Sequence, residues 1–127
     1  MTTDAQVTEI QVNGVTYVQK GSETASAPAK KVDGLGYVII RSAQAGVFAG
    51  YLKSRVGSEV VLLRARRLWF WDGAATLSEL ATNGTEKPSS CKFPEEVPEH
   101  LILGVIEVIP GSEKARVSIQ GVKAWKA

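Results

Sequence analysis

Histidine and cysteine are nearly missing from this chain of 127 residues, which holds one of each, His100 and Cys91. A single cysteine excludes a disulfide within the chain and any metal site built from several thiolates. For nucleophilic catalysis by a thiolate, Cys91 and His100 are the one possible Cys–His pair, and both come from one proline-rich stretch. The glutamates near His100 lack a known metal-ligand spacing, and no glycine-rich turn completes a dinucleotide or P-loop motif. We therefore expect a protein that is not an enzyme, with no metal and no cofactor.

An excess of charge of one sign is also missing, because 15 basic and 13 acidic residues leave a net charge of +2. A protein that binds duplex nucleic acid usually carries a broad basic surface, so the near balance favours a local anion pocket, and we expect no stable nucleic-acid partner. No apolar run is long enough to span a membrane, and the N-terminus lacks the basic and apolar parts of a signal peptide. We expect no membrane partner and a reducing, cytosolic setting.

Aromatic and basic residues are concentrated in one block, residues 64–73, with the sequence RARRLWFWDG. An extended chain would place Arg67, Trp69 and Trp71 on one side and Arg66, Leu68 and Phe70 on the other. Guanidinium groups fork around phosphate oxygens and aromatic rings stack on bases, so the block suits an anionic ligand that contains a base. A sheet core whose arginines extend from its edge would have the same residues.

Several stretches predict β-structure. Alternating apolar and polar residues around Asn13-Gly14 predict a β-hairpin over residues 9–18, and the small, charged and proline-containing residues 20–31 predict a linker behind it. Runs rich in β-branched and aromatic residues predict strands over residues 37–41, 47–55 and 59–71, the last two paired around a turn at 56–58. The small residues of 42–46 fit either a plain tight connection or a close approach of backbone to a ligand.

The second half of the chain predicts two short helices. Thr76 and Glu79 match a capping box and Asn83-Gly84 a helix stop, while Ser112 can cap a second helix over residues 113–120. Residues 85–100 hold three prolines and predict an irregular loop. The apolar, β-branched run 101–109 predicts one strand buried at the centre of the sheet, and Trp125 is expected to pin the extended tail to the body.

These elements predict one α+β domain over residues 35–127, a small antiparallel β-sheet with two short helices. An N-terminal β-hairpin arm and its linker are expected over residues 1–34. Binding has more support than catalysis, because arginines and aromatic residues dominate the predicted sheet. Arginines scattered over a sheet also fit a solvated face, and helix closure or loop solvation explains Asn83 and Lys87 as well as contact with a base or phosphate does.

Five blocks of the sequence carry a family resemblance: YVIIR at 37–41, AGVFAGYL at 45–52, ARRLWFWDGA at 65–74, CKFP at 91–94 and VIEVI at 105–109. They resemble the first phage-encoded family of Thoeris anti-defence sponges. The similarity covers about residues 35 to 126, and its most specific part is ARRLWFW; the N-terminal hairpin and linker lie outside it.

The resemblance implies a small protein that binds cyclic ADP-ribose isomers made by the bacterial Thoeris sensor, keeps them from the effector, and releases them intact when it unfolds. It implies a homo-oligomer in the host cytoplasm, with dimers assembling into a hexamer and pockets between subunits. Some members also hold cyclic oligonucleotides, namely cyclic trinucleotides, at a separate site. From chemistry and motif position, we expect the ligand to be bound by Phe48, Arg66, Trp69, Trp71, Asn83 and Lys87. Arg64 and Arg116 are expected at a second nucleotide site.

Two other interpretations stay open at this point. The chain fits a module that binds RNA or single-stranded DNA with the aromatic strand as a stacking platform, although the modest net charge argues against it. It also fits a phage structural or adaptor protein whose tryptophan-rich face is an oligomer interface, because aromatic residues and arginine are enriched at such interfaces.

Overall fold

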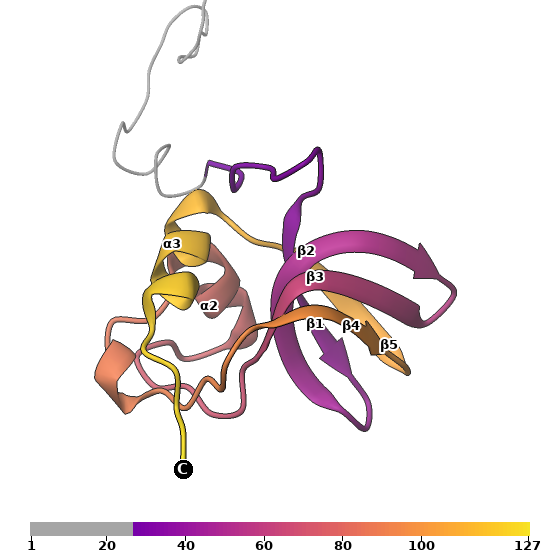
Figure 1. Ribbon diagram of the computed structural model, residues 1–127. Helices are drawn as coiled ribbons and strands as arrows, with labels where there is room; N and C mark the ends of the chain where they lie inside the picture. Colours follow the sequence, from indigo (N-terminus) through magenta and orange to yellow (C-terminus); the bar gives the residue numbers. More distant parts are fainter. Residues whose placement is uncertain (1–26) are drawn as a thin grey trace, which may run out of the picture.

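The computed structural model describes residues 27–127, so the hairpin predicted over residues 9–18 and most of the linker lie outside the described residues. Five strands, two α-helices and one short 3₁₀ helix make up the described part (Figure 1). In chain order they are β1 (Tyr37–Ser42), β2 (Gly46–Val56), β3 (Glu59–Arg67), α2 (Leu77–Asn83), η1 (Pro88–Ser90), β4 (Val97–Ile102), β5 (Val105–Pro110) and α3 (Glu113–Gly121). All strand pairs are antiparallel. The predicted α+β fold is confirmed.

The sheet curls into a small, partly closed barrel. Its strand order is β4-β3-β2-β1-β5, so β4 and β5 lie at opposite edges although only Leu103 and Gly104 separate them in sequence. This connection is held from both sides: the Ser42 hydroxyl donates to the Leu103 carbonyl at 2.7 Å, and the Val105 N–H donates to the Ser58 carbonyl at 2.9 Å. Figure 1 shows the strong curvature of β2 and β3 that brings the two edges together.

A bulge in β3 bends the strand just before the Arg/Trp block. The register between β2 and β3 shifts after Ala49, so Gly50 faces an extra residue of β3. Arg64 lies there with a φ of 51°, in the left-handed region that residues other than glycine rarely adopt. A Cβ atom on Gly50 would lie 3.0 Å from the Leu63 carbonyl oxygen, so glycine permits this close approach. The bulge re-aims the end of β3, which carries Arg66 and Arg67.

Both faces of β1 are buried, and they face two different hydrophobic cores. Tyr37 and Ile39 pack with residues of α2, α3 and the Phe93 segment, between the sheet and the helices. Val38 and Ile40 pack with β2, β3 and β4 inside the barrel. This explains why the run YVII has no polar alternation: a strand covered on both faces needs apolar residues at every position.

The two helices begin where their capping residues predict. The Thr76 hydroxyl accepts from the Glu79 N–H at 3.1 Å, and α2 ends at Asn83, with Gly84 as its C-cap at a φ of 74°. The Ser112 hydroxyl accepts from the Ala115 N–H at 3.0 Å and starts α3. Because these caps satisfy backbone groups that a helix leaves unpaired, short sequence motifs were enough to place both helices.

The prediction of one buried central strand over residues 101–109 is wrong. Gly104, with a φ of 68°, divides this run between β4 and β5, which are the two edge strands. Leu101, Leu103 and Ile106 are consequently exposed, at 55%, 58% and 64%. A long apolar run resembles one buried strand, but a glycine inside it can reverse the chain and produce two.

Two other boundaries differ from the predictions. β3 ends at Arg67, four residues before the predicted end at Trp71, because Phe70 leaves the sheet and exchanges two backbone hydrogen bonds with Lys92. The predicted irregular loop over residues 85–100 contains η1 and the first part of β4. The prolines of this stretch predicted a loop, but β4 is an edge strand, and an edge strand tolerates Pro98 where a central strand would not.

The described end of the predicted linker is bonded to the body. The Ala29 N–H donates to the Gly111 carbonyl at 3.2 Å, and the Lys30 N–H donates to Glu113 Oε1 at 2.7 Å. Residues 27–30 therefore follow the start of α3 instead of forming a free linker. The domain division at residue 34 stays a prediction.

Candidate functional site

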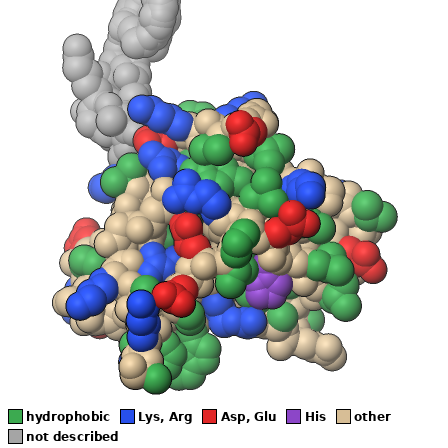
Figure 2. All heavy atoms as spheres, in the orientation of Figure 1, with side chains coloured by type: hydrophobic (Ala, Val, Ile, Leu, Met, Phe, Trp, Pro, Cys, Tyr) green, Lys and Arg blue, Asp and Glu red, His purple; other side chains and the backbone are tan. Residues whose placement is uncertain are grey.

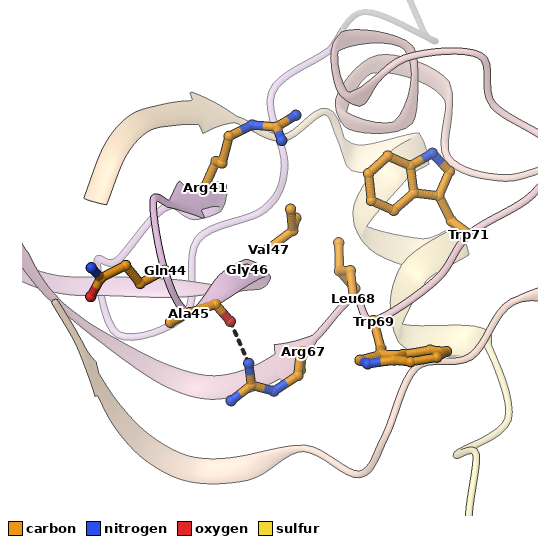
Figure 3. A pocket seen from close by; sticks show the side chains of 9 residues that line it. All are labelled: Arg41, Gln44, Ala45, Gly46, Val47, Arg67, Leu68, Trp69 and Trp71. Atoms are coloured by element: carbon orange, nitrogen blue, oxygen red, sulfur yellow. Dashed lines mark hydrogen bonds between the residues drawn. The ribbon is translucent and has the colours of Figure 1, made fainter. Parts of the chain in front are cut away.

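A groove of about 470 Å³ lies beside the turn between β1 and β2, next to the point where β3 ends. Its lining is Arg41, Gln44, Ala45, Gly46, Val47, Arg67, Leu68, Trp69 and Trp71. Figure 3 shows Arg41 and Trp71 on one side of Val47 and Leu68, and Arg67 and Trp69 on the other. Arg67, Trp69 and Trp71 all line this groove, but so does Leu68, which the predicted alternation placed on the opposite side, because β3 ends at Arg67.

Arg67 is fixed at the edge of the groove by two contacts. Its Nη1 donates to the Ala45 carbonyl at 2.5 Å, the bond drawn in Figure 3. Its guanidinium carbon lies 4.4 Å from the centre of the buried Phe48 ring, which sets the plane of the group. Within residues 27–127 no other acceptor binds Arg67, so most of its donors remain for an anionic ligand.

Arg41 supplies a second cation. Its Nε donates to Glu107 Oε1 at 3.0 Å, and both side chains are close to half exposed. Such an exposed ion pair contributes little stability, so a ligand phosphate can compete for the guanidinium. In the described part of the chain, no acceptor is bound to its two terminal nitrogens.

The two indoles of the groove differ in their support. Trp71 is half-buried and packs against the core that contains Leu68. Trp69 is 59% exposed and stacks on Trp125 of the C-terminal tail, with 5.3 Å between the ring centres and 18° between the planes. Trp71 is thus held by the body of the domain and Trp69 by the tail.

Trp69 also belongs to an exposed aromatic cluster, which consists of Trp69, Phe70, Lys92 and Trp125. Phe70 is 46% exposed and Trp125 is 45% exposed. The Lys92 ammonium lies 5.6, 5.9 and 5.5 Å from the ring centres of Trp69, Phe70 and Trp125. A lysine among three half-exposed rings offers a cation beside apolar planes, the same pairing of groups as in the groove.

The groove offers two kinds of contact that bind a nucleotide. Arginines bind phosphate oxygens through charge-assisted hydrogen bonds, and indole planes stack on bases. Its volume of about 470 Å³ lies within the usual range of small-molecule sites, about 300 to 1,000 Å³.

Residues 35–119, which include this groove, match a domain of unknown function, DUF6948. The chain belongs to this family. No curated protein and no solved structure matches the chain. The DUF6948 match runs from before β1 into α3, so it contains Arg41, Arg67, Trp69 and Trp71, and it ends before Trp125.

In this DUF6948 domain, Arg66 does not face the groove. Its side chain is 4% exposed and donates four hydrogen bonds to backbone carbonyls: Nε to Pro94 at 2.9 Å, Nη1 to Ile119 at 2.8 Å, and Nη2 to Phe93 at 3.1 Å and Val122 at 2.6 Å. Burial lowers the pKa of the guanidinium. The bulge and the strand pleat turn Arg66 inward, so its guanidinium makes these structural bonds and does not line the groove.

Three other predicted ligand residues lie away from the groove. Phe48 is fully buried beneath Arg67 and acts on the site only through that arginine. Asn83 is the last residue of α2, and the Lys87 N–H is bonded to the Thr85 hydroxyl at 2.9 Å. Neither Asn83 nor Lys87 lines the groove.

Sequence reasoning missed Arg41, Gln44 and Arg67 as groove residues. The strand alternation already placed Arg67 on the side of Trp69 and Trp71, so the signal for choosing it over Arg66 was present. The small residues of 42–46 left a close approach to a ligand open, but the position of the β1–β2 turn beside the end of β3, which brings Arg41 and Gln44 to the groove, is set by the fold and by no local pattern.

The two arginines expected at a second site both reach the buried Tyr51. Arg64 lies over its ring, 5.7 Å from the centre, and Arg116 donates to Gln120, whose Nε2 lies 3.2 Å from the tyrosine hydroxyl. Each arginine already has a carboxylate partner, Glu96 for Arg64 and Glu113 for Arg116. These carboxylate partners leave less charge on the two arginines for a second anion.

Cys91 and His100 both contact other residues of the domain and do not line the groove. Cys91 is buried, and its Sγ lies 3.6 Å from both the Asp72 carbonyl and the Thr85 hydroxyl. His100 packs edge-on against Phe48, with 5.0 Å between the ring centres. Among residues 27–127, no group of three metal-binding side chains was found, and none of the helices described there is long and apolar enough to cross a membrane.

Proposed function

We propose that this protein binds a nucleotide in the groove between Arg41, Arg67, Trp69 and Trp71 and sequesters it without chemical change. The observation that carries the proposal is the presence of two arginines and two indoles on one groove of about 470 Å³. The arginines would hold a phosphate or pyrophosphate and an indole would stack on the base.

The resemblance to phage Thoeris anti-defence sponges gives this proposal its finer form. The ligand would be a cyclic ADP-ribose isomer, and the protein would act in the host cytoplasm by binding the signal before the effector does. Cyclic oligonucleotides are a further ligand class under the same proposal. A sponge acts by mass action, so it must bind the signal more tightly than the effector does, and we propose nanomolar affinity, which corresponds to roughly 12 kcal/mol.

Such an affinity favours a homo-oligomer. Tight small-molecule sites bury most of the ligand surface, whereas Trp69 is 59% exposed at the rim of this groove. A second copy of the chain placed over the groove would exclude water from the ligand and strengthen its contacts with the arginines. We therefore propose a dimer-based assembly, extending to a hexamer, with the groove at the contact between subunits.

The aromatic cluster supports a second candidate function, binding of RNA or single-stranded DNA. Its three half-exposed rings and Lys92 resemble a stacking platform with a phosphate contact. Figure 2 shows, on the face it presents, basic side chains interspersed with acidic and hydrophobic ones instead of gathered into one basic stripe. This distribution, like the net charge of +2, favours the small nucleotide.

Capture followed by release tests the proposal. The protein is incubated with cyclic ADP-ribose isomers, freed of unbound ligand, heat-denatured, and the supernatant is analysed by mass spectrometry. Intact ligand supports sequestration, altered ligand indicates an enzyme, and no ligand from the wild type contradicts the proposal.

Matched variants connect the result to the groove. Arg67→Ala and Arg55→Ala remove the same charge, but Arg55 lies exposed near the tip of the β2–β3 hairpin and lines no part of the groove. Capture should be lost in Arg67→Ala and kept in Arg55→Ala. Equal losses in the two variants would indicate a nonspecific effect of charge.

Titration of a fluorescently labelled single-stranded oligonucleotide at two salt concentrations tests the second candidate function, because binding through phosphate contacts weakens steeply as salt rises.

A further inference from the structure

The C-terminal tail crosses the domain beside the Arg/Trp block and is attached there by three interactions. The Trp125 N–H donates to the Phe93 carbonyl at 2.9 Å, and the Lys126 ammonium lies 3.1 Å from Glu95 Oε2. The Trp125 ring stacks on Trp69, nearly parallel to it. The tail therefore has a defined position relative to the groove.

Trp69 depends on this tail for its orientation. It follows the end of β3, is 59% exposed, and within residues 27–127 stacks on no aromatic ring other than Trp125. Lys92 lies 5.6 Å from the centre of the Trp69 ring and 5.5 Å from that of Trp125, so it contacts the two stacked rings together. Trp71, by contrast, packs against the core and needs no such partner.

We infer that Trp125 is a positioning residue, which holds Trp69 in the orientation with which its ring lines the groove. The inference rests on the proposed function for its effect on ligand affinity, although the orientation of Trp69 can be measured without a ligand. An exposed indole that is free to change rotamer must be ordered when a ligand binds, and this cost lowers affinity. Stacking on Trp125 orders the Trp69 side chain when the chain folds, so a ligand that binds later does not have to order it.

Fluorine NMR on protein labelled with 5-fluorotryptophan tests the positioning directly. The chain has three tryptophans, so the signals are assigned by replacing each with phenylalanine in turn. In Trp125→Ala, the Trp69 signal should shift toward that of a free side chain and sharpen, while the Trp71 signal stays in place. Lys126→Ala is the control, because it removes the ion pair with Glu95 and leaves the stacked ring. An unchanged Trp69 signal in Trp125→Ala would overturn the inference.

Calorimetric titration with ADP-ribose and the cyclic ADP-ribose isomers as probes tests the consequence for binding. Trp125→Ala should weaken binding about tenfold, since ordering one large side chain costs up to about 1.5 kcal/mol. Trp125→Phe should recover most of the affinity, because a phenyl ring still stacks on the indole. In a Trp69→Ala background, Trp125→Ala should have no further effect. An equal loss in that background would mean that Trp125 contacts the ligand itself, which contradicts a positioning role.

The two proposals fail in different ways. If the wild type binds none of these probes, the proposed function is wrong, and the NMR experiment still decides the role of Trp125. If the wild type binds and Trp125→Ala binds equally well, the proposed function stands and the inference about Trp125 is wrong.

Discussion

Replacing Arg66 with methionine removes a guanidinium that donates four hydrogen bonds inside the protein. Two of the acceptors, the Ile119 and Val122 carbonyls, belong to the C-terminal end of α3, where a helix leaves carbonyls without intrahelical partners; the Ile119 carbonyl also accepts from the Val122 N–H. The other two lie in the segment before β4. Arg66 therefore joins β3 to both neighbours, and methionine fills a similar volume without any donor.

The expected loss of stability is about 3 kcal/mol. The Pro94 and Val122 carbonyls would be left without a donor among the described residues, at about 1.5 kcal/mol each, whereas the Phe93 and Ile119 carbonyls keep the Trp125 and Val122 N–H groups and lose about 0.5 kcal/mol each, which gives about 4 kcal/mol in all. Removing a buried charge returns part of this, because burial already disfavours the charged guanidinium and lowers its pKa. Arg67→Met is the comparison, since it loses one hydrogen bond and one cation–π contact at a partly exposed position, worth about 1 kcal/mol.

Urea unfolding followed by tryptophan fluorescence measures both variants. With a urea dependence of about 1.5 kcal/mol per molar, Arg66→Met should lower the midpoint by about 2 M and Arg67→Met by less than about 1 M. If the free energy of unfolding of Arg66→Met lies within about 1 kcal/mol of that of the wild type, the hydrogen bonds of Arg66 to the carbonyls do not stabilise the fold. Arg66 would then again be a candidate ligand residue.

Three further predictions concern stability. Arg64→Gly should be more stable than Arg64→Ala by about 1 kcal/mol in urea unfolding, the reverse of the usual preference in strands, because the φ of 51° suits glycine; the opposite order would contradict a strained bulge. Gly73→Ala should cost about 3 kcal/mol, since a Cβ there would lie 2.5 Å from a backbone nitrogen at a φ of 84°; a thermal melt close to that of the wild type would contradict this. Hydrogen bonds from the Arg116 guanidinium and the Lys30 N–H lower the pKa of Glu113 from 4.5 to about 2, so the contribution of this carboxylate is present above pH 4.5 and is lost as the pH falls toward 2. Because the Arg116–Glu113 pair is only partly buried, Glu113→Gln should remove about 1 kcal/mol of that pH dependence, and identical acid-unfolding curves would refute it.

Local signals predicted the elements whose structure is decided locally. Thr76, Ser112 and Gly84 specified helix ends because capping depends on the backbone within one turn. The β2–β3 hairpin followed from two β-rich runs around a short turn. Gly104 was missed because its effect depends on barrel closure, which brings the end of β1 and the start of β3 to the two sides of one connection.

The candidate site was half predictable for the same reason. Trp69 and Trp71 line the groove together with Arg67, but Leu68 also lines it, since the chain leaves the strand after Arg67 and the predicted alternation stops there. Arg66 was chosen instead because sequence chemistry does not distinguish two adjacent arginines, whereas their burial does. The stacking of Trp125 on Trp69 joins residues 56 positions apart, and only the folded chain shows it.

The central claim is that Arg67 and the indoles beside it bind a nucleotide, and isothermal titration of a cyclic ADP-ribose isomer into wild type, Arg67→Ala and Arg55→Ala tests it most directly. We predict saturable, high-affinity binding to the wild type and to Arg55→Ala, with at least tenfold weaker binding to a folded Arg67→Ala, equivalent to about 1.4 kcal/mol. No heat of binding with the wild type, or equal affinity in all three proteins, would contradict the account.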